Sequence, residues 1–203
     1  GRIDEGMREA NMAAALDPVS SRTLFLQARW AFLSRRYEEA TRLSEVVATR
    51  DPDNVLARWY LAQSFLLGGR PEEVPLLTRE DSVAASFGRE PSAALALWLS
   101  LRGEADSARV VIARVVSGYG EGDRDPVRIW STYAVLGEKE EAIHWMEQSI
   151  QELSPSARHI GVDPLADPLR DDPRYQALLE RIGLGHLKSR FDSLAAARPF
   201  GGT

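Results

Sequence analysis

Two arginines on one predicted helix have the chemistry to bind a carboxylate group. Arg22 and Arg29 are seven residues apart, or two helical turns, and Phe25 lies between them on the same side. Planar guanidinium groups beside aromatic rings suit an acidic peptide or a C-terminal carboxylate. The alternative interpretation is that the arginines are solvated and the aromatic rings fill gaps in the core.

Residues that commonly carry catalysis or bind metals are absent or poorly spaced. The chain has no cysteine, which excludes disulfides, thiolate metal sites and cysteine nucleophiles. Its three histidines, His144, His159 and His186, lack the spacing of a metal-binding pair. The sequence also has no G-x-S-x-G nucleophile motif. We therefore expect no enzyme activity, no cofactor and no metal.

Two loop-like segments superficially resemble ligand sites. The glycine-rich stretch 118–122 follows a predicted helix instead of a strand, and no Lys-Ser/Thr pair follows it, so a loop between helices is the better interpretation. The Asp-Pro series at 163–173 lacks the ligand order of a calcium-binding EF-hand. Proline stiffening and helix capping explain that series without an ion.

Composition predicts a folded protein without nucleic-acid or membrane affinity. Of 203 residues, 44% are hydrophobic and 27% are charged, and the net charge is −5. Nucleic-acid binding needs a basic surface, and a membrane span needs about 18 consecutive apolar residues. The lack of cysteine fits a reducing cytoplasm. The start at Gly1 has no initiating Met or secretion signal, so we expect a piece of a longer chain.

A short motif recurs at a fixed interval. Five similar segments begin at Gly1, Arg35, Gly69, Gly103 and Gly137, so the repeat interval is constant at 34. A glycine can end a helix in the left-handed conformation, and the acidic residues that follow suit the first turn of the next helix. A small residue closes four of the five motifs and predicts close helix packing. The exception is Val74.

Apolar residues at three- and four-residue steps precede each turn and predict a helix there. A second helix is predicted after each turn, for example over 38–49 and 140–153. Asp17-Pro18 and Asp51-Pro52 stand between units, where proline ends one helix and Asp or Asn caps the next. Trp30 and Trp98 are two repeats apart, which favours a packing role, and Trp145 is predicted to be in the core.

This arrangement resembles the tetratricopeptide repeat (TPR) family, whose repeat is a 34-residue helix pair. The resemblance implies a right-handed α-solenoid that binds a protein or peptide along its concave face. The residues of this chain in register with that face are Arg22, Phe25, Arg29, Phe32, Trp59, Gln63 and Leu97. The family's carboxylate clamp of Lys and Asn is not visible, so a chaperone tail is not an expected ligand.

The predicted repeat array covers residues 1–153. Its first helix lacks a partner, which predicts that Ile3, Met7 and Ala10 or Ala14 are partly uncovered and could mediate self-association. A last helix at about 186–198 is expected to cover the other end. The predicted boundaries are a half repeat at 1–18, units at about 20–51, 54–85, 89–118 and 125–153, and a capping segment with tail at 154–203.

The segment 162–179 resembles the closing part of TPR regions in large bacterial signalling proteins. This second resemblance implies a C-terminal scaffold or regulatory part that acts by protein–protein interaction in the cytoplasm. The alternative is a sensor domain whose groove holds a small ligand or peptide and controls an upstream effector domain.

Overall fold

The computed structural model describes residues 3–51, 54–70, 93–119, 126–154 and 157–187. Within these residues every regular element is a helix, which confirms the predicted all-helical class. None of the described helices is long and apolar enough to cross a membrane. The predicted second helix of the third unit with Val74, the glycine-rich stretch after Tyr119 and the predicted last helix beyond Leu187 lie outside the described residues.

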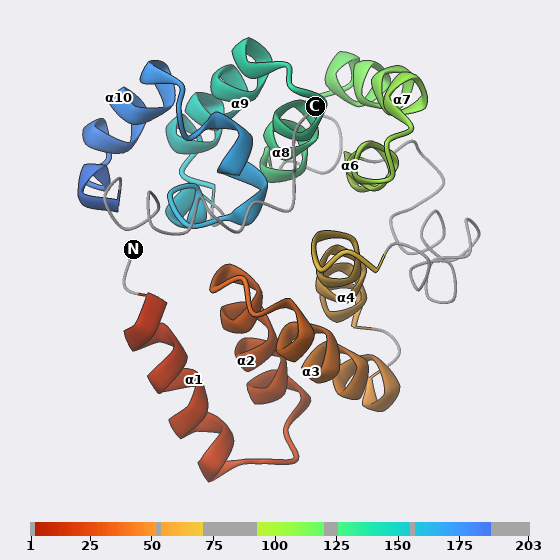
Figure 1. Ribbon diagram of the computed structural model, residues 1–203, viewed down its shortest axis with the longest axis vertical. Coiled ribbons are helices and arrows are strands. Elements are labelled where there is room, and N and C mark those ends of the chain that lie inside the picture. Colours follow the sequence, from red (N-terminus) through yellow and green to blue (C-terminus); the bar gives the residue numbers. More distant parts are fainter. Residues whose placement is uncertain (1–2, 52–53, 71–92, 120–125, 155–156, 188–203) are drawn as a thin grey trace. The chain divides into compact units, whose positions relative to one another are not determined.

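The chain divides into two compact units, of which the first contains helices α1 to α4 (Figure 1). Each helix packs against the next, and α2 also packs against α4. Helices α2 and α4 are therefore neighbours although α3 separates them in the sequence. The bounds are Ile3–Leu16 for α1, Ser21–Leu33 for α2, Tyr37–Arg50 for α3 and Val55–Leu67 for α4.

The second unit contains helices α6 to α10 and short 3-10 segments. Helix α6 packs against α7 and α8, and α8 packs against α9 and the 3-10 segment η3. The bounds of the elements are α6 Ala93–Leu101, α7 Ala105–Ser117, α8 Val127–Leu136, α9 Lys139–Gln151, η2 Ala157–His159, η3 Pro164–Leu169, α10 Pro173–Arg181 and η4 Gly185–Leu187.

The repeat interval of the sequence is also the period of the helices. Each second helix starts one repeat interval after the one before, or two intervals where α7 follows α3. The starts are Ile3 for α1, Tyr37 for α3, Ala105 for α7, Lys139 for α9 and Pro173 for α10. The last of these starts falls inside the segment that the sequence suggested as a cap. The period therefore continues to α10, and η3 occupies the place that α8 has in the preceding pair.

The turns between paired helices repeat with the same geometry. Arg35, Gly69, Gly103 and Gly137 have φ angles of 61°, 77°, 80° and 79°, in the left-handed region. The next residue then donates its N–H to a carbonyl five residues back, as Glu138 does to Tyr133 at 2.9 Å. The predicted left-handed helix end is confirmed at the three glycines.

Small residues near the start of the second helices allow close packing, as predicted. Ala40, Ala108 and Ala142 are each 0% exposed. At the equivalent Gly6, a Cβ atom would lie 2.3 Å from the Trp30 ring, so the indole occupies the space that a side chain would need.

The large aromatic side chains of the second unit contribute to its core. Trp98 and Trp145 are 5% and 7% exposed, which confirms the packing role predicted for them. Trp130, which the sequence did not single out, is fully buried. Burial of an indole removes a large apolar area from water, so these rings contribute strongly to stability.

Side-chain caps fix the start of several helices. The Asn54 amide oxygen accepts the Ala57 N–H at 3.0 Å at the start of α4. The Ser20 hydroxyl accepts the Thr23 N–H at 3.4 Å at the start of α2. Each cap satisfies an N–H that has no partner within the first helical turn.

Helix α1 is better covered than the sequence predicted. Ile3, Ala10 and Ala14 are 4%, 4% and 9% exposed, and α1 packs against α2, so the prediction that these three residues are partly uncovered is wrong. Met7 is half-buried, which fits the prediction. A hydrogen bond of 2.9 Å from Gln27 to Asn11 adds to this contact. The exposed large apolar side chains near this end of the chain are instead Met12, Leu16 and Val19.

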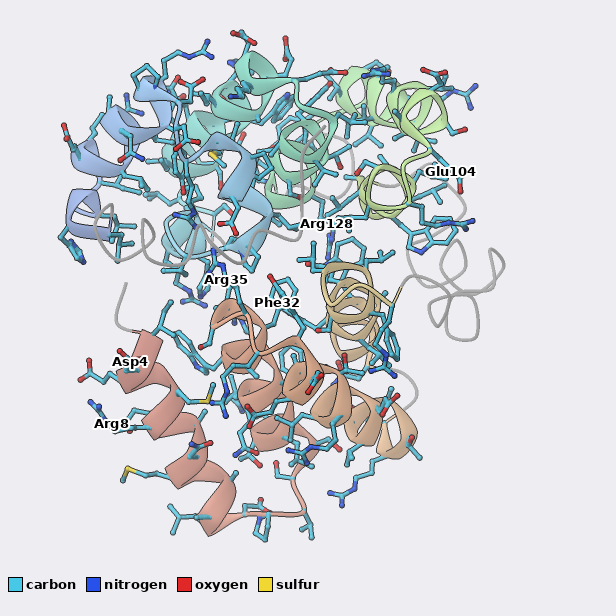
Figure 2. All side chains as sticks on the ribbon, in the orientation of Figure 1. Asp4, Arg8, Phe32, Arg35, Glu104 and Arg128 are labelled. Carbon is cyan, nitrogen blue, oxygen red and sulfur yellow. The ribbon has the colours of Figure 1, made fainter. Side chains whose placement is uncertain are left out.

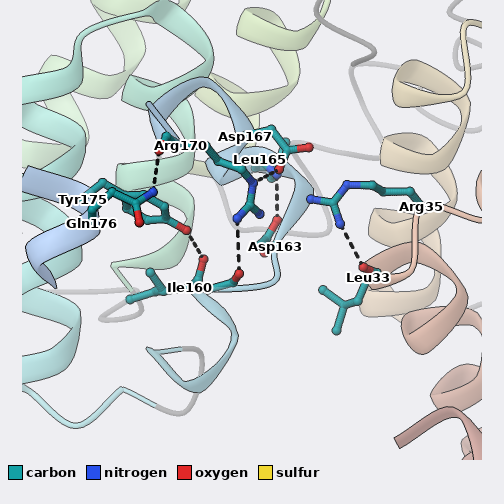
Figure 3. A network of polar contacts seen from close by, with 10 residues as sticks. Leu33, Arg35, Ile160, Asp163, Leu165, Asp167, Arg170, Tyr175 and Gln176 are labelled. Carbon is teal, nitrogen blue, oxygen red and sulfur yellow. Dashed lines mark hydrogen bonds and ion pairs between the residues drawn. The ribbon is translucent and has the colours of Figure 1, made fainter. Parts of the chain in front are cut away.

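Polar contacts hold the segment between η2 and α10 (Figure 3). The Tyr175 hydroxyl donates to the Ile160 carbonyl at 2.9 Å, and both residues are fully buried. Arg170 forms an ion pair with Asp167 at 2.6 Å. The Asp163 carboxylate accepts the Leu165 N–H at 2.9 Å. The Asp-Pro series therefore provides a helix cap, as the sequence suggested, and also an ion pair that the sequence did not predict.

Candidate peptide-binding face

Helices α2 and α4 are joined by aromatic rings. The rings of Phe25 and Tyr60 meet edge to face with centroids 5.7 Å apart, and those of Phe32 and Tyr60 are 5.2 Å apart. Edge-to-face pairs of this kind add to the energy of simple burial. Phe32 also contacts Tyr37 of α3 at 5.9 Å and is 1% exposed, so it belongs to the core and not to an accessible face.

Three of the predicted residues of α2 remain reachable from solvent. Arg22 is exposed, whereas Phe25 and Arg29 are half-buried. On α4, Trp59 is half-buried and precedes Tyr60, whose ring meets Phe25. We call Arg22, Phe25, Arg29 and Trp59 the α2–α4 face.

Two of the predicted binding residues are not accessible. Gln63 and Leu97 are 3% and 1% exposed, so a partner does not reach either side chain in this structure. Leu97 lies on the strongly apolar α6, in the second compact unit, whereas Gln63 lies on α4 in the first. The position of a residue within the repeat was not enough to predict whether its side chain is buried. On an apolar helix, burial depends on which neighbouring element covers each position.

The first unit also has an open hollow that the sequence analysis did not single out. It measures about 780 Å³ and lies where α3 begins and α4 ends. Its sequence signal is the arginine-rich stretch from Arg35 to Arg42. The lining residues are Arg35, Arg36, Tyr37, Glu38, Glu39, Arg42 and Gly68.

Among the described residues, strong pKa shifts occur where α10 begins beside α9. Arg174 bonds Asp172 at 2.7 Å and Glu140 at 2.9 Å. The hydrogen bonds from Arg174 lower the pKa of Asp172 to about 2, despite the opposing effect of burial. The pKa of Glu140 is also lowered, by a backbone hydrogen bond and by Arg174. These contacts tie two consecutive second helices together, which is a structural role.

Side chains on the surface of the second unit are similarly tied by ion pairs. Arg109 bonds Glu138 at 2.7 Å and Asp106 at 3.3 Å, and these acidic partners raise its pKa. Burial and the nearby Glu141 and Glu138 raise the pKa of Tyr133. Among the described residues, no group of three or more His, Asp or Glu side chains is arranged to hold a metal ion.

Comparisons with known protein families, with curated proteins and with solved structures found no match.

Proposed function

We propose that this chain binds a protein or peptide partner on the α2–α4 face. The observation that supports the proposal is the contact between Phe25 and Tyr60, which joins the two helices beside a half-buried Arg29 and an exposed Arg22. Aromatic residues and arginine are the types most enriched at the energetic centres of interfaces. A face that is already assembled loses little conformational entropy when a partner binds.

The proposal includes membership of the TPR family and a right-handed α-solenoid. It is supported by the constant repeat interval between helix starts and by the repeated left-handed turn after α2, α4, α6 and α8. The contacts of α2 with α4, and of α6 with α8, are those expected when first helices of successive pairs line one side.

The chemistry of the α2–α4 face favours a partner with carboxylate groups. From residue 3 to residue 51 the basic residues are all arginine, with no lysine. The guanidinium group forms two parallel hydrogen bonds to a carboxylate, which a lysine ammonium does not. We further propose that the chain is the scaffold or regulatory part of a larger cytoplasmic bacterial signalling protein, on the basis of the tail segment 162–179.

A pull-down from a bacterial lysate tests the proposed face. The bait is the whole chain, compared with a variant that carries Arg22→Ala, Arg29→Ala and Trp59→Ala. The matched control carries Arg114→Ala and Arg158→Ala, two exposed arginines of the second unit. Circular dichroism confirms that each variant is folded.

We expect a partner that the parent and the control retain and that the triple variant loses, with about tenfold or greater weakening of affinity. A partner retained equally by all three baits would move the site away from α2 and α4. A bound small molecule, found by mass spectrometry of the parent and absent from the triple variant, would favour a sensor domain over a scaffold.

A further inference from the structure

The hollow at the start of α3 combines positive charge with an aromatic wall. Three of its seven lining residues are arginines and two are glutamates, whereas the whole chain has a net charge of −5. The lining residues of the hollow therefore carry a formal charge of +1 (three arginines against two glutamates) on an acidic protein. The wall beside Tyr37 is closed by Gly68, where an added Cβ would lie 3.3 Å from the Tyr37 Cβ and 2.6 Å from the Ser64 carbonyl.

Two of the three arginines that line the hollow are exposed. Arg36 forms an ion pair of 2.6 Å with Glu39, and 56% of the Arg36 side chain is exposed. Arg42 is exposed one helical turn beyond Glu38, on the same side of α3. Arg35, Arg36 and Arg42 all line the hollow.

Arg35 occupies a backbone position where the other repeats have glycine. Its φ angle is 61°, and the equivalent Gly69, Gly103 and Gly137 have φ angles of 77°, 80° and 79°. A side chain in this conformation is strained, and strained residues tend to occur where function requires the side chain. Arg35 lines the hollow, and its Nη1 also donates to the Leu33 carbonyl at 3.3 Å (Figure 3).

We propose that this hollow is a second binding site, which takes the carboxylate side chains of an acidic peptide segment. Arg35, Arg36 and Arg42 supply the guanidinium groups, and the Tyr37 ring supplies an apolar contact. The site is separate from the α2–α4 face because none of the four residues of that face lines the hollow. It does not depend on the function proposed for the face.

The test measures binding of a fluorescein-labelled hexaglutamate peptide to the whole chain by fluorescence anisotropy at low salt. Arg42→Ala removes one guanidinium group, and we expect about tenfold weaker binding. Arg35→Gly also weakens binding, yet it relieves the backbone strain and raises the melting temperature. Lost binding in Arg35→Gly is therefore not explained by unfolding.

A second pair of variants sharpens the test. Glu38→Gln removes a negative charge from the lining and is expected to tighten binding by a few fold, because like charges repel. Arg114→Ala changes an exposed arginine of the second unit and should bind hexaglutamate like the parent. Hexalysine of the same length should not bind.

Three outcomes would overturn the proposal. Arg35→Gly and Arg42→Ala could both bind hexaglutamate as the parent does, while Arg22→Ala does not, which would place the peptide on the α2–α4 face. The parent could fail to bind at all. Inorganic phosphate could displace the peptide far more effectively than acetate at equal ionic strength, which would assign the hollow to phosphate and not to carboxylate.

Discussion

The first unit of this protein builds one of its two left-handed turns with Gly69 and the other with Arg35, whereas the second unit uses glycine at both equivalent positions. In the second unit Gly103 and Gly137 take the left-handed conformation without steric strain. In the first unit Arg35 takes it with a full side chain. The comparison shows that the repeated turn requires a left-handed backbone conformation but not a glycine. A residue other than glycine in this conformation is strained, and such residues tend to occur at functional sites.

Ion pairs link helices of the second unit, as Arg174 links α10 to Glu140 of α9, one repeat interval earlier. On the first unit the α2–α4 face has an exposed Arg22 beside the ring of Phe25. We interpret the second unit as the stabilised end of the array and the first as the part that binds.

The largest expected difference between the units is in the free energy of unfolding when a tryptophan side chain is removed. Trp130→Ala should lower the free energy of unfolding by about 3–5 kcal/mol, because Trp130 is fully buried and its removal leaves a cavity. Urea denaturation monitored by circular dichroism measures the change. Trp30→Ala in the first unit should cost less, because Trp30 is only half-buried. Equal losses would contradict this comparison, because they would show that the partial exposure of Trp30 does not reduce its contribution to stability.

An exchange of turn residues tests the comparison directly. Gly137→Arg should lower the free energy of unfolding by about 1–2 kcal/mol, because it places a side chain at a φ of 79°. Arg35→Gly should raise the free energy of unfolding by up to about 1 kcal/mol, reduced by the greater freedom of glycine in the unfolded chain.

The same urea titrations measure both turn variants. Leu153→Gly is a control, since Leu153 is, among the residues that the structure describes, the other non-glycine residue with positive φ, at 53°. A destabilised Arg35→Gly would mean that the Arg35 side chain stabilises the fold by more than its backbone strain costs.

Acid should destabilise the ion pair between Asp172 and Arg174 at the start of α10. The pKa of Asp172 is lowered from 3.8 to about 2, so its contribution is present above pH 3.8 and is lost as the pH falls towards 2. We expect that loss to be about 1 kcal/mol, because water screens the half-exposed Arg174. The pH dependence of unfolding of Asp172→Asn, compared with the parent, measures it. Parallel curves between pH 2 and pH 4 would contradict the assignment.

Much of the fold could be predicted because its signals are local. The interval from Arg35 to Gly137 is visible in the sequence, since each turn needs a special backbone conformation and each second helix starts with acidic residues. The start of α10 at Pro173 was missed because η3 replaces the usual first helix, so no apolar helical stretch precedes it. The Asp172 cap, one repeat interval after Glu138, was the available signal.

The candidate sites were less predictable because burial depends on contacts between distant elements. Arg22 and Phe25 could be placed on one side from helical spacing alone. Gln63 and Leu97 share the register of that side but are buried, and no local pattern reveals what covers them. The hollow at Arg35 likewise requires the end of α4 to approach the start of α3.

The first unit also presents exposed charges away from α2. Asp4 and Arg8 project from α1 on its outer side (Figure 2). Their separation of one helical turn resembles that of Glu38 and Arg42 on α3, one repeat interval later. A charged pair at these repeat positions therefore does not by itself define a binding site. The α3 pair differs from the α1 pair because Arg35 and Arg36 line the same hollow.

The most direct test of the proposed function is photo-crosslinking from the α2–α4 face. Benzoylphenylalanine replaces Phe25 in one variant and the exposed Val110 of α7 in another, and both are irradiated in a bacterial lysate. We expect a discrete crosslinked partner from position 25 that is lost when Arg22→Ala is added, and none from position 110. The same partner from both positions, or none from position 25, would contradict the assignment of binding to α2 and α4.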